Sequence, residues 1–185
     1  MKFERKTLFS TDRKHRYLLW RESGCDLFDA QTGKRADDFV QFVGLNPSTA
    51  NETEDDPTIR RCIALTKRWG YGCLAMTNIF SMVTAYPNEL DDTRFSDENR
   101  ELVMDAAKRA GMIICCWGNF SQAQKWGRAL VAVLVEDNLP VFHLGLNQNG
   151  SPKHPLYLKS DTLPTPYASV PNVEFRRAEP ERPNN

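Results

Sequence analysis

Amide and hydroxyl side chains follow an apolar run near residue 45, and they are the first candidates for a ligand site. Residues 40–45 are mostly apolar and partly β-branched, which predicts a buried strand, and Asn46, Pro47 and Ser48 come directly after it. Gly44 permits a close approach of a neighbour or ligand. Because open α/β sheets bind ligands at the carboxyl ends of their strands, these groups could bind a polar ligand. A plain helix-capping turn uses the same residue types and is the alternative interpretation.

Three further segments place polar side chains where apolar runs end. Asn78 ends the run that begins at residue 73, Trp117 follows residues 112–116, and Lys153 and His154 lie in a loop after residues 140–144. The carboxyl ends of parallel strands meet at one edge of a sheet, so we expect these groups to converge with Asn46. For Asn78 a turn-capping role is an open alternative, Trp117 could pack or stack on a base, and His154 is expected to be exposed.

Other chemistries have less support in the sequence. Ser48 has no His or Asp at a spacing that makes it a convincing nucleophile. The five cysteines include no C-x-x-C pair and only three histidines are present, which argues against a disulfide framework or a zinc site. We expect reduced, buried thiols and neither a metal nor a cofactor. Asp55 and Asp56 are expected to cap a helix and to pair with Arg60 or Arg61.

The elements that must position these residues alternate between strand and helix. Helices are predicted over 57–69, 96–109 and 121–136, from capping residues and from apolar residues at helical spacing. This alternation predicts an α/β fold: a three-layer αβα sandwich with a mostly parallel central sheet of about four strands, plus a short N-terminal β segment.

Length and composition set the outer limits. The 185 residues are 41% hydrophobic and 26% charged, as in an ordinary globular protein, and formal net charge is zero. Zero net charge argues against strong non-specific nucleic-acid binding. We expect one α/β domain over 1–172, with an N-terminal β extension (1–38), a core (39–160) and a flexible tail (173–185). No membrane-spanning run or signal peptide is visible, which predicts a cytoplasmic protein.

Several of these motifs, in this order, resemble a known family. GLNPSTA from residue 44, DDPTIRRC from 55, RWGYG from 68, TNIF from 77 and SPKHPLYL from 151 closely resemble the domain of unknown function 1643 family, found in bacteria and phages. The resemblance covers about residues 40–160 and carries no activity with it.

The same pieces are more distantly similar to the uracil-DNA glycosylase superfamily. That superfamily begins its site with a G-x-[ND]-P loop, matched by 44–47, and has an asparagine at the end of a middle strand, matched by Asn78. A strand ending in Trp-Gly is matched by Trp117 and Gly118, and a closing His-Pro loop by His154 and Pro155. The resemblance implies a uracil-DNA-glycosylase-like fold.

The resemblance also implies roles for individual residues. Asn46 would hold a water against the anomeric carbon and His154 would donate to a base carbonyl, as the catalytic residues. Gly44, Pro47, Ser48, Asn78, Trp117 and Lys153 would bind the substrate. Asn78 offers the donor and acceptor needed to read a pyrimidine edge. Asparagine rather than aspartate at position 46 departs from the most active uracil-excising branch.

The implied function is binding of a nucleobase or nucleotide, with possible hydrolysis of the N-glycosidic bond of a modified or mismatched pyrimidine. The partner would be a nucleobase, a nucleotide, or single-stranded or flipped-base DNA. The acidic segment 52–56 lies beside the first site loop and would repel a DNA backbone. Two alternatives use the same fold: a non-catalytic nucleotide-binding or modified-base-binding module, and an accessory protein-interaction domain.

Overall fold

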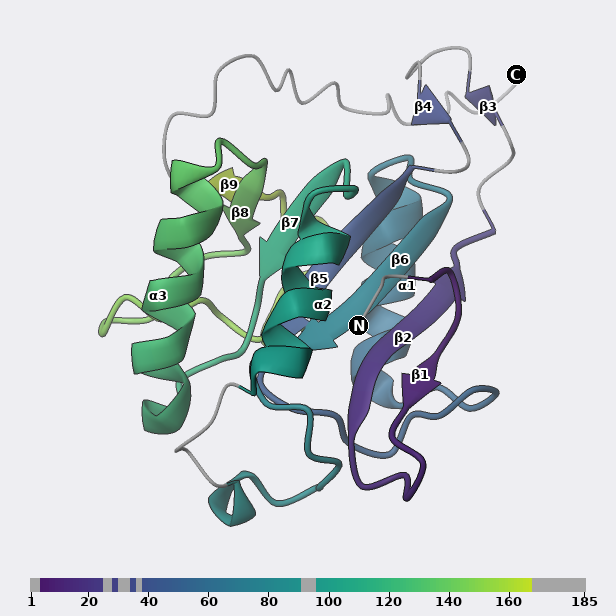
Figure 1. Cartoon of the computed structure of the whole chain (residues 1–185). Helices are drawn as coiled ribbons and strands as arrows, with labels where there is room; N and C mark the ends of the chain where they lie inside the picture. The colour runs from purple at the N-terminus through teal and green to yellow at the C-terminus, as the bar shows by residue number, and fades with distance from the viewer. Residues whose placement is uncertain (1–3, 25–27, 30–33, 36–37, 91–95, 168–185) are drawn as a thin grey trace, which may run out of the picture.

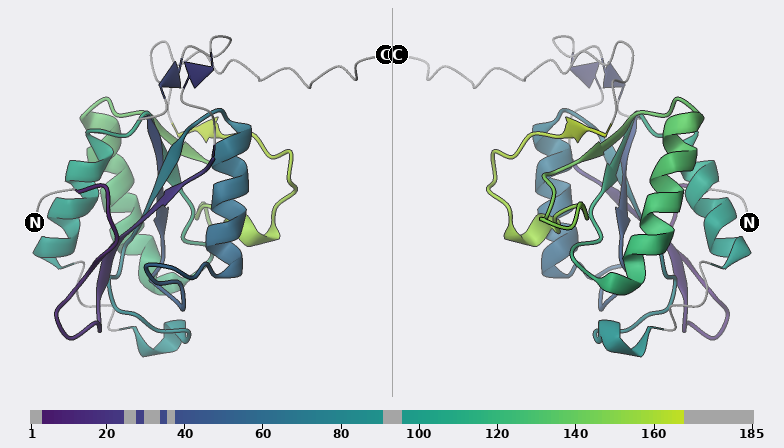
Figure 2. Two further views of the ribbon diagram at one scale, coloured as in Figure 1. Left: turned by 90° about the vertical axis from the view of Figure 1, so that its right-hand side faces the viewer. Right: turned by 90° about the vertical axis from the view of Figure 1, so that its left-hand side faces the viewer.

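The computed structural model describes residues 4–24, 28–29, 34–35, 38–90 and 96–167, which form an α/β fold (Figure 1). In these residues seven strands build one mixed sheet in the order β1-β2-β6-β5-β7-β8-β9. Helices cover both faces of the sheet, so that three layers are seen from the side (Figure 2). Two short strands, β3 (Phe28–Asp29) and β4 (Lys34–Arg35), pair separately.

The centre of the sheet is parallel and fully buried. It consists of β5 (Phe39–Gly44), β6 (Cys73–Asn78), β7 (Met112–Cys115) and β8 (Val141–His143). The chain leaves β5 to one side to form β6 and later returns to its other side to form β7. Such a reversal opens a crevice beyond the carboxyl ends of the strands, which is where ligands bind in open α/β sheets.

The parallel centre confirms the sequence prediction, but the predicted number of about four strands is too low. β2 (Arg16–Glu22) pairs antiparallel with β6, and β1 (Leu8–Phe9) pairs with β2. On the opposite edge, β9 (Thr165–Pro166) pairs antiparallel with β8. The N-terminal segment joins the sheet because its apolar residues 17–19 are buried between the layers. A proline is tolerated in β9 because an edge strand needs fewer ladder donors.

Three α-helices lie where the sequence predicts them, with differences of one or two residues at their ends. They are α1 (Pro57–Arg68), α2 (Asp97–Ala107) and α3 (Ser121–Glu136), and two short 3-10 helices are η1 (Pro87–Glu89) and η2 (Pro155–Tyr157). Asp56 caps α1 by accepting from Ile59 N–H at 2.8 Å, and Ser96 caps α2.

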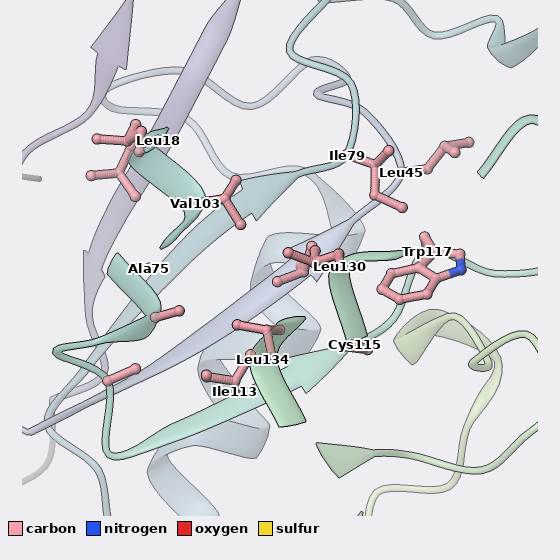
Figure 3. Packing of buried hydrophobic residues seen from close by; sticks show 14 of the residues in the cluster. Leu18, Leu45, Ala75, Ile79, Val103, Ile113, Cys115, Trp117, Leu130 and Leu134 are labelled. Atoms are coloured by element: carbon pink, nitrogen blue, oxygen red, sulfur yellow. The ribbon is translucent and has the colours of Figure 1, made fainter. Parts of the chain in front are cut away.

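The two faces of the sheet carry separate cores. On one face α1 packs Leu65 and the residue after its end, Trp69, near Phe42. On the other face α2 and α3 contribute Val103 and Leu130 to a cluster that includes the strand residues (Figure 3). Burial on both faces holds the central strands rigidly, and the loops at their carboxyl ends are therefore held in place.

Some predictions concern residues outside the described part of the chain. The predicted tail 173–185 and Cys25 both lie there. The division into extension, core and tail stays a prediction. Within the described residues, no helix is both long and apolar enough to cross a bilayer.

Candidate functional site

A cavity of about 870 Å³ lies beyond the carboxyl ends of β5, β6 and β7. Of the eight residues that the sequence assigns to a site, seven line it: Gly44, Asn46, Ser48, Asn78, Trp117, Lys153 and His154. The eighth, Pro47, does not line it; Pro47 is buried, and its carbonyl accepts from Thr84 N–H at 3.0 Å. The structure therefore brings together segments that are up to 110 residues apart in the sequence, because β5 lies between β6 and β7.

Asn46 holds the first loop and leaves one oxygen for a ligand. Its Nδ2 donates to the carbonyls of Pro47 and Thr84, both at 2.8 Å. These two bonds use both side-chain donors, and Oδ1 accepts no hydrogen bond from the residues that the structure describes. Oδ1 is therefore free to accept a hydrogen bond from a water or a ligand in the cavity, and the residue is half-buried there.

Asn78 presents an unpartnered amide to the same cavity. It is 2% exposed, and its Nδ2 is buried without a hydrogen-bond partner among the described residues. Gly44 pairs with Asn78 across β5 and β6, and a Cβ at Gly44 would lie 2.7 Å from Asn78 Oδ1. Asn99 on α2 donates to the backbone carbonyls of Asn78 and Ile79 at 2.9 and 3.0 Å. Buried amides are normally satisfied, so a hydrogen-bond acceptor on a bound ligand would supply the partner that this nitrogen lacks among the described residues.

Trp117 forms a wall of the cavity from within the core. It is 3% exposed and its indole N–H has no partner among the described residues. On α3, Gly127 leaves room for the ring, since a Cβ there would lie 2.5 Å from Trp117 Cζ2. Figure 3 shows Trp117 at the edge of the α2–α3 core. Trp117 therefore packs in the core and also lines the cavity, while its stacking on a base stays a prediction.

His154 lies in a loop held at several points. Gly118, with φ +79°, donates its N–H to Pro152 O at 3.0 Å. A Cβ at Gly118 would lie 3.5 Å from His154 Cβ, so the two residues are in close contact. Lys153 N–H donates to Gly145 O at 2.9 Å, and Arg61 on α1 donates to Leu158 O. The sequence prediction that His154 is exposed is wrong: these contacts draw the loop onto α1 and leave the imidazole half-buried.

The environment of His154 sets its protonation state and tautomer. Burial lowers the pKa of His154 below its ordinary value, and the negative charge of Asp56 opposes this shift. Nδ1 accepts from Leu156 N–H at 3.4 Å. A neutral imidazole that accepts at Nδ1 carries its proton on Nε2, so His154 can donate from Nε2 at neutral pH.

We expect the free energy of unfolding to fall as the pH is lowered from 7.5 to 5.5, partly because of His154. Its pKa is lowered in the folded state, so below about pH 6.5 the unfolded chain binds a proton that the folded protein does not. Urea unfolding of His154→Asn should show a smaller decline than wild type. Burial also lowers the pKa of His143, so His143→Asn should reduce the decline of the free energy of unfolding with falling pH further. An unchanged decline in His154→Asn would contradict the assignment.

Arg16, which is not among the residues predicted from the sequence, also lines the cavity. It begins β2, it is 2% exposed, and its Nη1 donates to Ala50 O at 2.7 Å. In the sequence Arg16 is one of several basic residues within the first 16 positions, so its type alone does not single it out. Its position directly before the apolar run 17–20 is the signal in the sequence that Arg16 could begin a buried strand.

Asp56 and Thr58 at the start of α1 were also missed as cavity residues. Asp56 caps the helix as predicted, but the described residues contain no ion pair of Asp55 or Asp56 with Arg60 or Arg61, and Arg60 donates to the backbone carbonyl of Asp55 instead. Asp55 instead pairs with Arg21 on β2 at 2.7 Å, because β2 extends the sheet towards this loop. Glu52 pairs with Arg13, also at 2.7 Å. Two charges of the acidic segment are thus balanced, and the carboxylate of Asp56 remains in the cavity.

The described residues contain no group of three His, Cys, Asp or Glu side chains that could hold a metal ion. Cys116 lines the cavity, but burial raises the pKa of its thiol, so that it stays protonated and a poor nucleophile. The groups that can act in the cavity are therefore amides, hydroxyls, one imidazole, one carboxylate and basic side chains. This set suits recognition of a polar, planar or anionic organic ligand.

Comparison with known proteins adds a family but no activity. A family model described as a protein of unknown function matches residues 16–156. The match begins at Arg16, within the segment predicted as an N-terminal extension, and it includes Asn46, Asn78 and His154. No curated protein and no solved structure matches the chain significantly.

Proposed function

Since the chain belongs to the DUF1643 family, whose description assigns no function, we propose a function from the chemistry of the cavity: it binds a nucleobase or a nucleotide. The observation that carries this proposal is that Asn46, Asn78 and His154, from three separate segments, line one cavity. A volume of about 870 Å³ lies in the range of small-molecule sites and accommodates a nucleotide. The buried, unpartnered amide of Asn78 supplies a donor and an acceptor for the polar edge of a base.

The same residues support hydrolysis of an N-glycosidic bond, in the manner of a uracil-DNA-glycosylase-like protein. In that reaction the bond from C1′ to the base nitrogen breaks and its electron pair leaves with the base. A water oxygen bonds to C1′ and the water releases one proton. His154 Nε2–H stabilises the negative charge on a base carbonyl, and Asn46 Oδ1 orients the water.

The proton requires a different group. An amide does not accept a proton at neutral pH, so Asn46 orients the water without activating it. Asp56 supplies a carboxylate in the same cavity that can take this proton. We therefore propose a slow or specialised activity on a modified or mismatched pyrimidine, supplied as a nucleotide, in single-stranded DNA or as a flipped base.

Incubation with oligonucleotides that contain uracil, hydroxymethyluracil or mismatched thymine tests the hydrolysis directly. We expect abasic product, detected by alkaline cleavage, from at least one single- or double-stranded substrate. His154→Ala should lower the rate by about 10²- to 10³-fold, as loss of a donor to the leaving group does in other enzymes. Asn46→Ala should also lower it, whereas His15→Ala, outside the cavity, should not.

The alternatives predict other outcomes. A non-catalytic module would give no abasic product, and its binding of a nucleotide would survive Asn46→Ala. An accessory protein-interaction domain would show no affinity for any nucleobase or nucleotide. A thermal-shift panel separates this last case, because a ligand that binds the folded state raises the unfolding temperature.

A further inference from the structure

Arg16 is a buried cation whose hydrogen-bonding capacity is only partly used. It is 2% exposed and lies at the start of β2, next to β6 in the sheet. Leu19 pairs with Met76 in the antiparallel register, and an isolated bridge pairs His15 with Met82, so Arg16 lies beside the segment that directly follows β6. Its backbone N–H donates to Ser81 O at 2.8 Å. Arg16 is thus fixed at the same edge of the sheet as the proposed base-binding residues.

Part of the guanidinium has no partner. Nη1 donates to Ala50 O at 2.7 Å, but Nε is buried without a partner and Nη2 makes no hydrogen bond to the described residues. No carboxylate of the described residues lies within 4 Å as an ion pair; Asp56 acts on Arg16 only through its longer-range field. Burial lowers the pKa of Arg16 to about 10, so the group is still charged at neutral pH. A buried charge of this kind normally has a counter-ion.

Neighbouring groups in the cavity are suited to the same ligand. The first turn of α1 leaves the backbone N–H of Thr58 unused, since Asp56 accepts from the next two amides, those of Ile59 and Arg60. The hydroxyls of Thr58 and Ser48 also line the cavity and make no hydrogen bonds to the described residues. Donors on a helix start and a guanidinium with two adjacent free N–H groups together match the oxygens of a phosphate.

We propose that Arg16, with Thr58 and Ser48, binds the phosphate of a nucleotide whose base contacts Asn78 and His154. The cavity then selects nucleotides over nucleosides and free bases. This inference rests on the proposed function for the binding of the nucleobase. It adds that the ligand carries a phosphate, which the residues that contact the base do not determine. The phosphate could belong to a free mononucleotide or to the end of a strand, and the shared chemistry is a phosphate ester of a nucleoside.

Calorimetric titration of the full-length protein tests the proposal. The panel comprises uracil, deoxyuridine and dUMP, the corresponding thymine and cytosine series, inorganic phosphate, and a trinucleotide with or without a 5′-phosphate. For at least one base, we expect the 5′-monophosphate to bind about 10- to 100-fold more tightly than its nucleoside, as charge-assisted, bidentate contacts allow. Tighter binding of the phosphorylated trinucleotide than of the mononucleotide would assign the phosphate to a strand end.

Variants of Arg16 assign the effect to this residue. Arg16→Gln should reduce the ratio of nucleotide to nucleoside affinity to about one and leave nucleoside affinity within about twofold, whereas Arg16→Lys should keep part of the ratio. Arg21→Gln is the matched control: it lies on the same strand, pairs with Asp55 and does not line the cavity. If Arg16→Gln does not fold, the ratio of nucleotide to nucleoside affinity in the wild type and in Arg16→Lys still tests the proposal.

The outcomes separate this inference from the proposed function. Equal affinity for nucleosides and their monophosphates would overturn the phosphate site and leave base binding intact. A phosphate-dependent gain that persists in Arg16→Gln would overturn the assignment to Arg16. Absence of binding by every member of the panel would overturn both proposals.

Discussion

Replacing Asn78 by leucine should abolish ligand binding and at the same time stabilise the ligand-free protein. The Nδ2 group is buried without a partner, which costs about 1–3 kcal/mol in a folded protein. Leucine has a similar size and removes this cost, so we expect the free energy of unfolding to rise by about 1 kcal/mol. The same change removes the proposed donor and acceptor for the base, and nucleotide affinity should fall at least about 100-fold.

Urea unfolding and calorimetric titration measure the two effects of Asn78→Leu separately. Thr66→Val is the matched control, since the Thr66 hydroxyl is also buried without a partner but lies on α1 outside the cavity. It should gain stability in the same way and bind ligand normally. If Asn78→Leu is less stable than wild type and binds normally, then Asn78 is a structural residue rather than part of the site.

Replacing Gly127 by alanine should destabilise the protein by about 1–3 kcal/mol. The new Cβ would lie 2.5 Å from Trp117 Cζ2 and 2.6 Å from Cε2, which forces the ring or the helix to move. Overpacking of a core costs about this much even after the gain in helix propensity from glycine to alanine. Because Trp117 also lines the cavity, ligand affinity should fall together with stability.

A double-mutant cycle with Trp117→Phe identifies the cause. Phenylalanine is smaller than tryptophan and has no atom at the position of Cζ2, the nearest ring atom to the new Cβ, so Gly127→Ala should cost less in that background. The coupling free energy from urea unfolding should be at least about 1 kcal/mol and favourable. Additive effects of the two substitutions would show that the close approach of Trp117 to α3 is not what requires glycine at position 127.

Local patterns were sufficient for the central strands and the three helices. The apolar runs that became β5, β6 and β7 are short, and capping residues such as Asp56 and Ser96 stand directly before the helices. The edges of the sheet were harder to predict. β9 has two residues and includes a proline, so it has no periodicity to recognise, and it exists only because β8 offers it an edge. The pairing of β2 with β6 depends on contacts more than 50 residues apart.

Seven of the eight residues that the sequence assigned to a site line one cavity, because polar residues at the ends of parallel strands must meet at one edge. Arg16 escaped notice because β2 runs antiparallel, so that its first residue, not its last, reaches this edge. The sequence predicts Asp56 as a helix cap, but a capping pattern does not indicate which cavity the start of the helix will line.

The sequence by itself therefore determined the α/β class, the helix positions and the amide-rich strand ends, since these depend on residue type and local spacing. The tertiary structure decided which of these groups share a cavity and what state they are in. Burial leaves the amide of Asn78 and part of the Arg16 guanidinium without partners, and it favours a neutral His154. These properties arise from exclusion of water and from packing of distant segments, and no local pattern encodes them.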